Sequence, residues 1–309
     1  MEANVYFSHF SLDLEKWNQE GECQNILASL RGLLSQIQVS TYGKVIIPDR
    51  WHEVIISAKN IFEYIRDDIF KGDDQLFGAV LKQIYDETLR GCKNENITTI
   101  IASERISSGQ PSGDNLGFFA ALKYTTNWDN IPNEYHVSCE SDLRKLAEQF
   151  MRDFPVDEES FTERAKKVFN NLEFHADVAV TMRTHGKVNS KAKYGAAAIT
   201  GITGFSQSVV KALSALNQVT LAGKTTRQIQ AEVSAISGFD CSPQGNGKSA
   251  LDAKWVEMGV TDIDCQYHVK ISKSNREGDN TFYQDRIYFG FKNDAAGKKI
   301  FVIHSGWHL

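Results

Sequence analysis

The chain has 309 residues, of which 41% are hydrophobic and 24% charged, and its formal net charge is −5 at pH 7. These values are ordinary for a globular protein and exclude a globally disordered chain, and the length suits roughly two domains of about 150 residues. No stretch has the roughly 18 uninterrupted apolar residues of a membrane span, and the N-terminus lacks the basic and apolar regions of a secretory signal. We therefore expect no membrane association.

The first third of the chain has helical periodicity. Apolar residues recur at three- and four-residue intervals from Leu12 to about Leu34, from Trp51 through Phe70, and from Leu76 to Leu89. Pro48 with Asp49 can open the second of these segments, the first is interrupted around Gly21, and the third ends near Gly91. The pattern predicts a helical bundle.

The pattern then changes to two short runs of β-branched, aromatic and small apolar residues. They begin at Ile97 and Leu116, and a turn-rich segment at 107–115 separates them, which predicts a hairpin with a long loop. Helical periodicity returns at 140–150 and 158–172, and Asp157 is the expected N-cap of the second segment.

Residues 184–204 are rich in glycine and small residues and contain three closely spaced lysines. This composition is typical of a domain boundary or a mobile loop. Two further helices are predicted at 205–219 and 225–236.

The final 45 residues contain three predicted strands, at 266–272, 285–291 and 299–304. Turn-rich segments separate them, so an antiparallel meander is the simplest arrangement. We expect an α+β fold, with a mainly helical N-terminal part and a C-terminal part of two helices and a small antiparallel sheet. The expected division is an acidic domain at 1–183, a flexible basic linker or loop at 184–204, and a basic α+β domain at 205–309.

Charge is distributed unevenly along the sequence. Residues 1–182 contain 29 acidic and 18 basic side chains, a net charge of −11, whereas residues 183–309 contain 10 acidic and 16 basic side chains, a net charge of +6. A basic C-terminal part would attract an anionic partner. Two alternatives stay open: the two parts attract each other, or the basic residues form a solvated face.

Strand alternation places several proton-transferring and cationic side chains on one face of the predicted meander. Histidine suits proton transfer near neutral pH, and Lys and Arg stabilise charge on a phosphorane-like transition state. Metal-free RNA cleavage by 2′-hydroxyl attack needs these ingredients. The candidate roles are general base and acid for the histidines, phosphate binding for the cations and an orienting role for the phenol. The candidate catalytic residues are His268, Lys270, Arg286, Tyr288 and His304.

Basic residues in the linker and in the turns of the C-terminal part are the candidates for nucleic-acid binding. They are Lys187, Lys191, Lys193, Lys273, Arg276 and Lys298. The expected partners are RNA or DNA at the basic part and a protein at the acidic helical part. Against this stands the ordinary alternative that a half-exposed antiparallel sheet carries polar residues on its outer face.

Two motif types receive no support. The Gly-Lys-Ser and Gly-Lys-Thr triplets at 247–249 and 223–225 lack the first glycine of a phosphate-binding loop, since Ser242 and Gln218 stand there. Cys265 and His268 have zinc-ligand spacing, as do the histidines at 304 and 308, but two strand residues three apart point to opposite faces. We therefore expect neither a cofactor nor a metal.

The five cysteines are scattered and form no Cys-x-x-Cys pair, which argues against a disulfide framework and favours the cytoplasm. The leading hypothesis is a cytoplasmic effector that acts on nucleic acid through the C-terminal sheet. Its most concrete form is a metal-free endoribonuclease in a toxin or phage-defence system. The alternative is a non-catalytic subunit that docks a protein partner and binds nucleic acid.

Overall fold

The computed structural model divides the chain into two compact units, Met1–Ala147 and Glu148–Leu309. The expected boundary at 184–204 differs from this division, because the helices and strand at 158–182 pack with the C-terminal sheet. The structure describes residues 3–18, 21–40, 42–109, 117–124, 126–187, 200–243, 249–259, 265–271, 273–276, 284–291 and 299–309.

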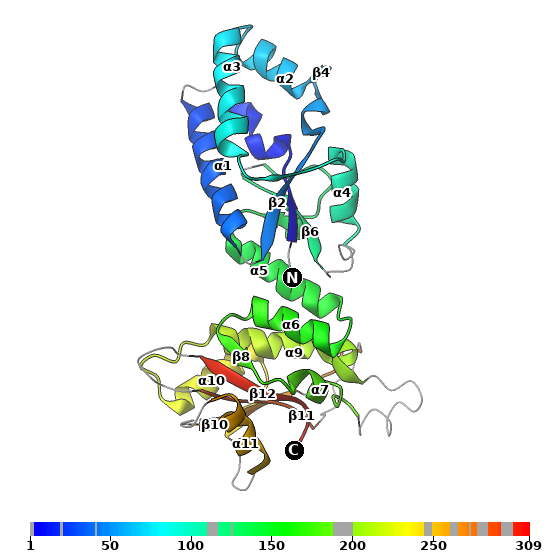
Figure 1. The fold of residues 1–309 in the computed structure, drawn as a ribbon, viewed down its shortest axis with the longest axis vertical. Coiled ribbons are helices and arrows are strands. Elements are labelled where there is room, and N and C mark those ends of the chain that lie inside the picture. The colour runs from blue at the N-terminus through cyan, green and yellow to red at the C-terminus, as the bar shows by residue number, and fades with distance from the viewer. Residues whose placement is uncertain are drawn as a thin grey trace. The chain divides into compact units, whose positions relative to one another are not determined.

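The N-terminal unit is built on a five-stranded sheet in the order β5-β2-β1-β6-β7 (Figure 1). Every neighbouring pair in this sheet is parallel. The expectation of a helical bundle in this part is therefore wrong. The strands are β1 (Ala3–Tyr6), β2 (Gly43–Pro48), β5 (Lys93–Glu95), β6 (Phe118–Leu122) and β7 (His136–Val137).

Helices cover both faces of this sheet. The crossover from β1 to β2 contains α1 (Glu22–Val39), and the crossover from β5 to β6 runs in the opposite direction and contains α4 (Thr99–Ser107). Right-handed crossovers that run in opposite directions place their helices on opposite faces, and Figure 1 shows α1 and α4 on either side of β2 and β6. The expected hairpin is wrong, since Thr98 caps α4 and β6 pairs with β1 and β7.

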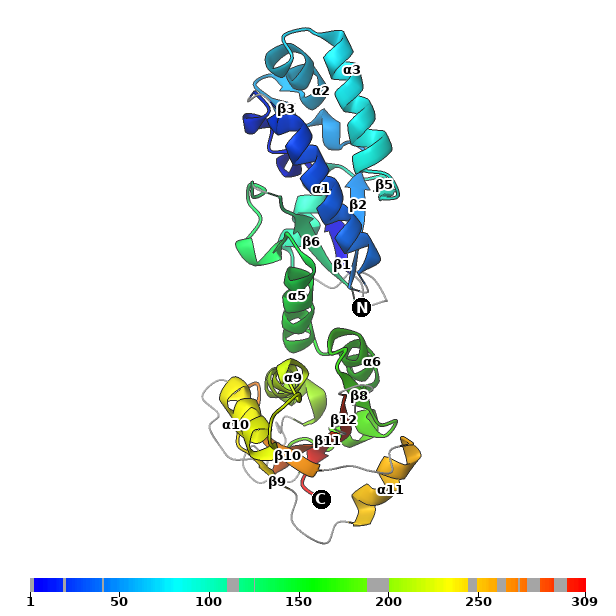
Figure 2. The same ribbon diagram turned by 90° about the vertical axis from the view of Figure 1, so that its left-hand side faces the viewer.

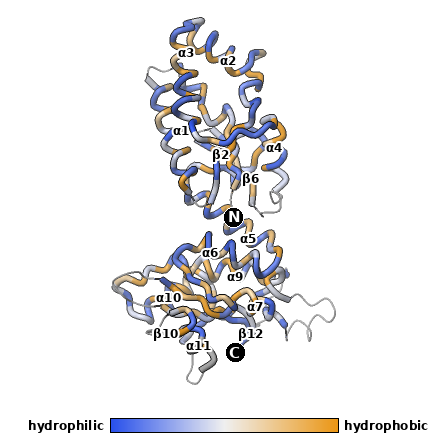
Figure 3. Tube along the Cα trace, viewed as in Figure 1, coloured by the Kyte–Doolittle hydropathy of each residue, from blue (hydrophilic) through white to orange (hydrophobic). Residues whose placement is uncertain are grey.

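The apolar side of α1 explains its position. Polar and apolar residues alternate along this helix in Figure 3, and the buried ones recur at helical spacing. These buried residues are Cys23, Ile26, Leu27, Leu30, Leu33, Leu34 and Ile37.

A long insertion between β2 and β5 lies beyond the carboxyl ends of the strands (Figure 1). It opens with a 3-10 turn and a two-stranded hairpin, and continues as two helices that each end in a π-helical turn. The bounds are Trp51–Glu53 for the 3-10 turn, β3 (Ile55–Ile56) and β4 (Lys59–Asn60), α2 (Ile61–Tyr64) with Ile65–Ile69, and α3 (Asp74–Lys82) with Gln83–Thr88. Further 3-10 turns in this unit are His9–Leu12, Leu14–Lys16 and Asn133–Tyr135.

The C-terminal unit is built on a second five-stranded sheet, in the order β8-β12-β11-β10-β9. All neighbouring strands are antiparallel except β8 and β12, which are parallel. The expected mixed α+β fold with a C-terminal antiparallel sheet is confirmed. The strands are β8 (Leu172–Phe174), β9 (Cys241–Pro243), β10 (Cys265–Ile271), β11 (Asp285–Phe291) and β12 (Ile300–Trp307).

Helices flank both faces of this second sheet as well. Figures 1 and 2 agree in placing α9 and α11 on opposite sides of β10, β11 and β12. Asp157 caps α6 by accepting a hydrogen bond from the Ser160 amide, as predicted. The helices are α6 (Glu158–Val168), α7 (Val178–Met182), α9 (Gly201–Gln218), α10 (Thr226–Ser237) and α11 (Ser249–Glu257), and α5 (Glu140–Asp153) contains the boundary between the units.

The structural boundary changes the charge distribution. Residues 1–147 carry 21 acidic and 14 basic side chains, a net charge of −7, and residues 148–309 carry 18 acidic and 20 basic side chains, a net charge of +2. The acidic segment at 148–182 therefore belongs to the same unit as the basic residues. Within the described residues, no helix has the length and apolar character needed to cross a membrane.

Candidate functional site

The five candidate catalytic side chains lie in adjacent positions on three neighbouring strands. His268 of β10 is opposite Tyr288 of β11, and Tyr288 is opposite His304 of β12. The ring centroids are 5.5 Å apart in the first pair and 5.3 Å apart in the second. Lys270 is opposite Arg286, one position further along the same face. The strand alternation thus brings the five residues together.

Most of this face is not open to solvent. Arg286 is 6% exposed, Tyr288 1% and His304 4%, whereas His268 and Lys270 are half-buried. The expectation that all five side chains point outward is therefore wrong for three of them. For Tyr288 the reason is α11, whose Leu251 and Trp255 pack in one cluster with Tyr288 and Ile303.

His304 is held in a neutral state by its surroundings. Its Nε2 lies 2.9 Å from the backbone carbonyl oxygen of Trp307, to which an Nε2–H donates. Burial lowers the pKa of His304 from its ordinary value of 6.5 to about 4. At neutral pH this ring is therefore the neutral imidazole, and the imidazolium form that a general acid needs is not populated.

Arg286 and Tyr288 each make a hydrogen bond with the backbone, Arg286 within β11 and Tyr288 with Leu309. Nη1 of Arg286 donates to the carbonyl oxygen of Asp285 at 2.8 Å, and the amide of Leu309 donates to the Tyr288 hydroxyl at 3.3 Å. Burial lowers the pKa of Arg286 and raises the pKa of Tyr288. The phenol therefore stays protonated at neutral pH, and it lies beside the His268 ring on the neighbouring strand.

The accessible part of the face is a cluster on β9, β10 and the residue before β9. We call Asp240, Ser242, His268 and Lys270 the edge cluster. Ser242 is opposite His268 in the strand register, and the amide of Lys270 donates to the carbonyl oxygen of Asp240 at 2.9 Å. The Lys270 ammonium pairs with Oδ2 of Asp240, to which the Ser242 hydroxyl also donates, at 3.1 Å.

The charges of the edge cluster are set by this pairing. The hydrogen bond from Lys270 is the main cause that lowers the pKa of Asp240, with further contributions from Ser242 and from the charge of His268. Asp240 is therefore ionised at neutral pH. The Asp240 side chain is also 61% exposed, so solvent and ligands can reach the carboxylate.

Asp240 and Ser242 were missed in the sequence because β9 is only three residues long and ends in a proline. Such a strand has no recognisable alternation, and proline is confined to edge strands. The available signal was the sequence Asp-Cys-Ser-Pro at 240–243, which fits a short edge strand that joins a helix to a sheet.

The basic candidates fall into two groups. Lys273 and Arg276 are exposed in the turn after β10, where the carbonyl oxygen of Lys273 accepts a hydrogen bond from Ser208 at 2.8 Å. Lys187 is exposed in the turn after α7. The remaining candidates lie outside the described residues; they are Lys191, Lys193 and Lys298.

Within the described residues, the zinc spacing does not assemble into a site, and neither does the triplet at 223–225; the triplet at 247–249 lies largely outside these residues. His268 and His304 are two strands apart with Tyr288 between them, and the described residues contain no group of three His, Cys, Asp or Glu side chains that could hold a metal. In the triplet at 223–225, Thr225 instead caps α10 in a capping box with Gln228.

A buried polar trio lies on the other side of β11 and β12. Nε2 of His185 is 2.9 Å from the Ser305 hydroxyl, and its Nδ1 is 3.7 Å from Oδ1 of Asp285. The Asp285 carboxylate accepts hydrogen bonds from the Gly186 amide at 3.0 and 3.2 Å. All three side chains are 0% exposed, so the Ser305 hydroxyl lies in the interior of the unit. The trio links β11 and β12 to the segment after α7.

Comparison of the chain with protein-family models, with curated proteins and with solved structures finds no match. The edge cluster is therefore interpreted from its own geometry and chemistry. It combines an imidazole, an ammonium and a carboxylate on an accessible sheet edge. Such a set can bind an anion and transfer a proton.

Proposed function

We propose that the C-terminal unit acts on RNA at the edge cluster, as a metal-independent endoribonuclease. One observation carries the proposal: His268 and Lys270 lie on the same face of β10, and both stay accessible when the rest of that face is covered. An imidazole beside an ammonium is the minimum needed to remove a proton from a 2′-hydroxyl and to hold the neighbouring phosphate.

The proposed reaction uses the accessible residues alone. His268 accepts the 2′-hydroxyl proton, the 2′-oxygen attacks phosphorus, and the bond to the 5′-oxygen breaks to leave a 2′,3′-cyclic phosphate. Water protonates the departing 5′-oxygen, because the open edge admits solvent. Lys270 stabilises the negative charge that builds on the phosphate oxygens.

The buried members of the face act as positioning residues in this scheme. Tyr288 packs against the His268 ring, with their centroids 5.5 Å apart, and His304 packs against Tyr288 from the other side. This row limits the orientations that His268 can adopt. His304 itself needs no proton transfer for this role.

A non-catalytic function is the second candidate, and the burial of His304 favours it. Cleavage of RNA is faster when one group removes a proton and another supplies one, and the accessible edge offers a single imidazole. In this alternative the edge cluster holds the RNA backbone without cutting it, and the protein serves as a subunit of a larger complex.

Substitution of Asp240 should change the affinity for RNA in a direction that its charge predicts. Its carboxylate neutralises the Lys270 ammonium and repels a phosphate, so Asp240→Asn should bind single-stranded RNA more tightly than the wild type. Lys270→Ala should bind more weakly. Three phosphate contacts, from Lys270, Lys273 and Arg276, should make the affinity fall roughly 20-fold between 50 and 200 mM salt.

The cleavage test compares the full chain with matched variants on mixed RNA in the presence of EDTA. Wild type should yield fragments with cyclic phosphate ends, and His268→Gln should cut at least 100-fold more slowly because glutamine does not take up a proton. His52→Gln in the other unit and Lys299→Ala, which removes a lysine paired with Glu173 on the same sheet, should cut like wild type.

The outcomes separate the two candidates. Equal cleavage by wild type and His268→Gln would overturn the catalytic assignment. Intact RNA together with salt-dependent binding would support the non-catalytic subunit. If the protein does not bind RNA even at low salt, both candidate functions are contradicted.

A further inference from the structure

The N-terminal unit contains a cavity of 510 Å³ at the carboxyl edge of its parallel sheet, in a different unit from the edge cluster. We propose that this cavity binds a small molecule of the nucleoside class, with a planar ring and hydroxyl groups, and that it rejects the phosphorylated forms of that molecule. The cavity volume lies within the range of small-molecule sites, about 300–1,000 Å³.

The position of the cavity follows from the strand order. In chain order the five strands are arranged 3-2-1-4-5, so the direction of winding reverses between β1 and β6. The segments that follow two such strands separate in opposite directions and leave a crevice, where ligands of open α/β sheets bind. His9 and Asp13 of the cavity follow β1, and Thr126 and Asp129 follow β6.

The charge of the cavity argues against a phosphate. Three carboxylates line it, from Asp13, Glu15 and Asp129, and among its described lining residues none is Lys or Arg. Lys16 neutralises part of this charge through its ion pair with Asp13 at 2.7 Å. Burial lowers the pKa of His9 to about 4, so its imidazole adds no positive charge at neutral pH.

Carboxylates accept hydrogen bonds from hydroxyl donors, and this lining suits a ribose or a similar polyol. No glycine-rich segment follows β1, whose continuation is Phe-Ser-His-Phe-Ser. The backbone therefore lacks the close approach that holds a pyrophosphate in dinucleotide sites. Both observations favour a ligand without phosphate.

The remaining lining supplies apolar and aromatic surface for a planar ring. Phe10 and Tyr64 contribute aromatic rings, and Ile55 and Ile56 of β3 contribute aliphatic side chains. The Trp128 ring packs against Phe10, with the ring centroids 6.3 Å apart. Stacking of a base on an aromatic side chain stabilises binding by about 1–3 kcal/mol.

The backbone around the cavity is held in conformations that are unfavourable for ordinary residues. Asp13 has φ 51° and Ser57 has φ 51°, and Ala58 and Asn130 next to the lining have φ 65° and 62°. At Ser57 and Ala58 this is the geometry that the two-residue loop between β3 and β4 requires, whereas Asp13 and Asn130 are non-glycine positions of the kind that gather at ligand-binding sites. Ser57, the first residue of the turn between β3 and β4, lines the cavity.

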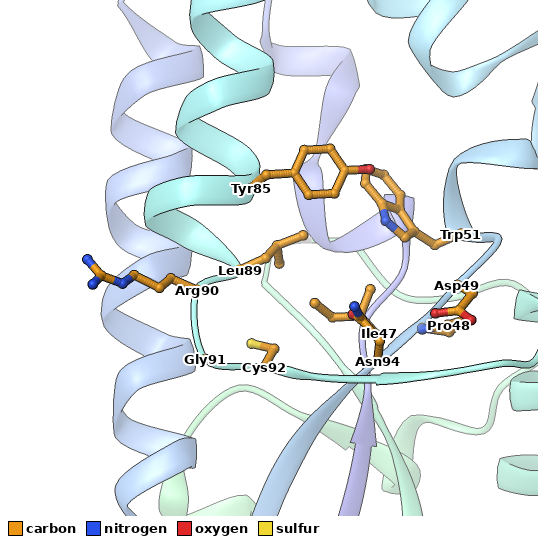
Figure 4. A pocket seen from close by; sticks show the side chains of 10 residues that line it. All are labelled: Ile47, Pro48, Asp49, Trp51, Tyr85, Leu89, Arg90, Gly91, Cys92 and Asn94. Carbon is orange, nitrogen blue, oxygen red and sulfur yellow. The ribbon is translucent and has the colours of Figure 1, made fainter.

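A second hollow on the same edge is a weaker candidate. Its volume is 280 Å³, and its lining includes Trp51, Tyr85, Asp49 and Arg90. Figure 4 shows the Arg90 side chain extending away from the other lining residues. This hollow lies near the ends of β2 and β5, away from the reversal between β1 and β6.

Calorimetric titration of the full chain with adenosine, guanosine, cytidine and uridine, and with their 5′-monophosphates, tests the proposal. At least one nucleoside should bind, and its 5′-monophosphate should bind at least tenfold more weakly because the carboxylates repel it. Asp129→Asn should weaken nucleoside binding about tenfold, the loss expected for a hydrogen bond to a charged group. Asp86→Asn, an exposed aspartate outside the cavity, should bind like wild type.

Asp129→Lys extends the test by reversing one charge at an exposed position, where the fold tolerates the change. This variant should reverse the preference toward the monophosphate. Equal binding of nucleoside and monophosphate by wild type would overturn the charge argument, and no binding of any nucleoside up to millimolar concentration would overturn the proposal. His268→Gln should leave nucleoside binding unchanged, so failure here is distinguishable from failure of the RNA proposal.

Discussion

The Thr126 hydroxyl donates a hydrogen bond of 2.9 Å to Oδ1 of Asp13 across the point where the winding of the N-terminal sheet reverses. Asp13 is 5% exposed and also pairs with Lys16. Close by, the Ser11 hydroxyl donates to the carbonyl oxygen of Leu122 at 2.9 Å. The segments after β1 and β6 are therefore tied together beside the cavity, although 113 residues separate Asp13 from Thr126.

Replacing Thr126 with valine should loosen this connection. The variant keeps the shape of the side chain and removes the donor, so the free energy of unfolding of the N-terminal unit should decrease by about 1 kcal/mol. Thr126→Ser retains the hydroxyl and serves as the control. Urea titrations of the two variants measure the difference; equal stability of the two would show that the hydrogen bond contributes nothing to folding.

The stability of the C-terminal unit should depend on the protonation of His304. Its folded-state pKa of about 4 lies below the ordinary value of 6.5, so between these pH values the unfolded chain binds a proton that the folded chain does not. Stability is therefore complete above pH 6.5 and decreases as the pH falls toward 4. The full loss from this group is about 3 kcal/mol, from about 1.4 kcal/mol per pKa unit.

The measurement is hydrogen exchange of β11 and β12 at pH values from 7 to 4.5, corrected for intrinsic exchange rates. His304→Gln keeps a donor for the Trp307 carbonyl and does not titrate, so its protection should change less with pH than that of wild type. An identical pH dependence in both proteins would contradict the role of His304.

Gly306 should tolerate no side chain. A Cβ at this position would clash with the carbonyl oxygen of Thr181 and the hydroxyl of Thr184, both in the segment that packs against β12. Gly306→Ala should therefore destabilise the C-terminal unit by about 3 kcal/mol or more, the upper part of the range for overpacking. The midpoint of thermal unfolding measures the loss.

Gly32 provides the contrasting case for the same substitution. It lies in the middle of α1, and a Cβ there would meet nothing within 4 Å. Gly32→Ala should stabilise the N-terminal unit by about 0.5–1 kcal/mol, because alanine loses less backbone entropy in a helix. A destabilisation of similar size in both alanine variants would contradict the packing described for Gly306.

Removing the cap of α6 should weaken the C-terminal unit. The carboxylate of Asp157 accepts hydrogen bonds from the amide and the hydroxyl of Ser160, at 2.7 and 3.0 Å. Asp157→Ala should cost about 1 kcal/mol of stability, whereas Asp157→Asn retains an acceptor and should cost less. Chemical denaturation measures the free energy of unfolding of both variants. A lower value for Asp157→Asn than for Asp157→Ala would be inconsistent with capping.

Three helices of the C-terminal unit were predictable because their signals are local, whereas α7 and α11 were not predicted. The apolar periodicity at 158–172, 205–219 and 225–236 corresponds to α6, α9 and α10, and Asp157 marks the start of α6. The three long strands β10, β11 and β12 were predictable for the same reason, since alternation and flanking turns are read within a few residues.

The parallel sheet of the N-terminal unit was missed because most of its strands carry no local signal and the pairing of the recognised one is long-range. β1 and β2 are short apolar runs buried on both faces, and such runs do not alternate. The run at 118–122 was recognised as a strand, but it pairs with β1, more than one hundred residues away, instead of with its sequence neighbour. A parallel pairing across that distance depends on packing that the sequence does not display.

The sequence by itself determined the mixture of helices and strands, the antiparallel arrangement of the C-terminal strands and the position of His268, Tyr288 and His304 on one face of them. Each depends on the two-residue period of a strand or on the periodicity of a helix. Only the tertiary structure decided that α11 covers Tyr288, that Asp240 pairs with Lys270, and that the segments after β1 and β6 line a cavity. These features arise where distant segments pack together, because burial and charge pairing depend on the neighbours that folding brings into contact.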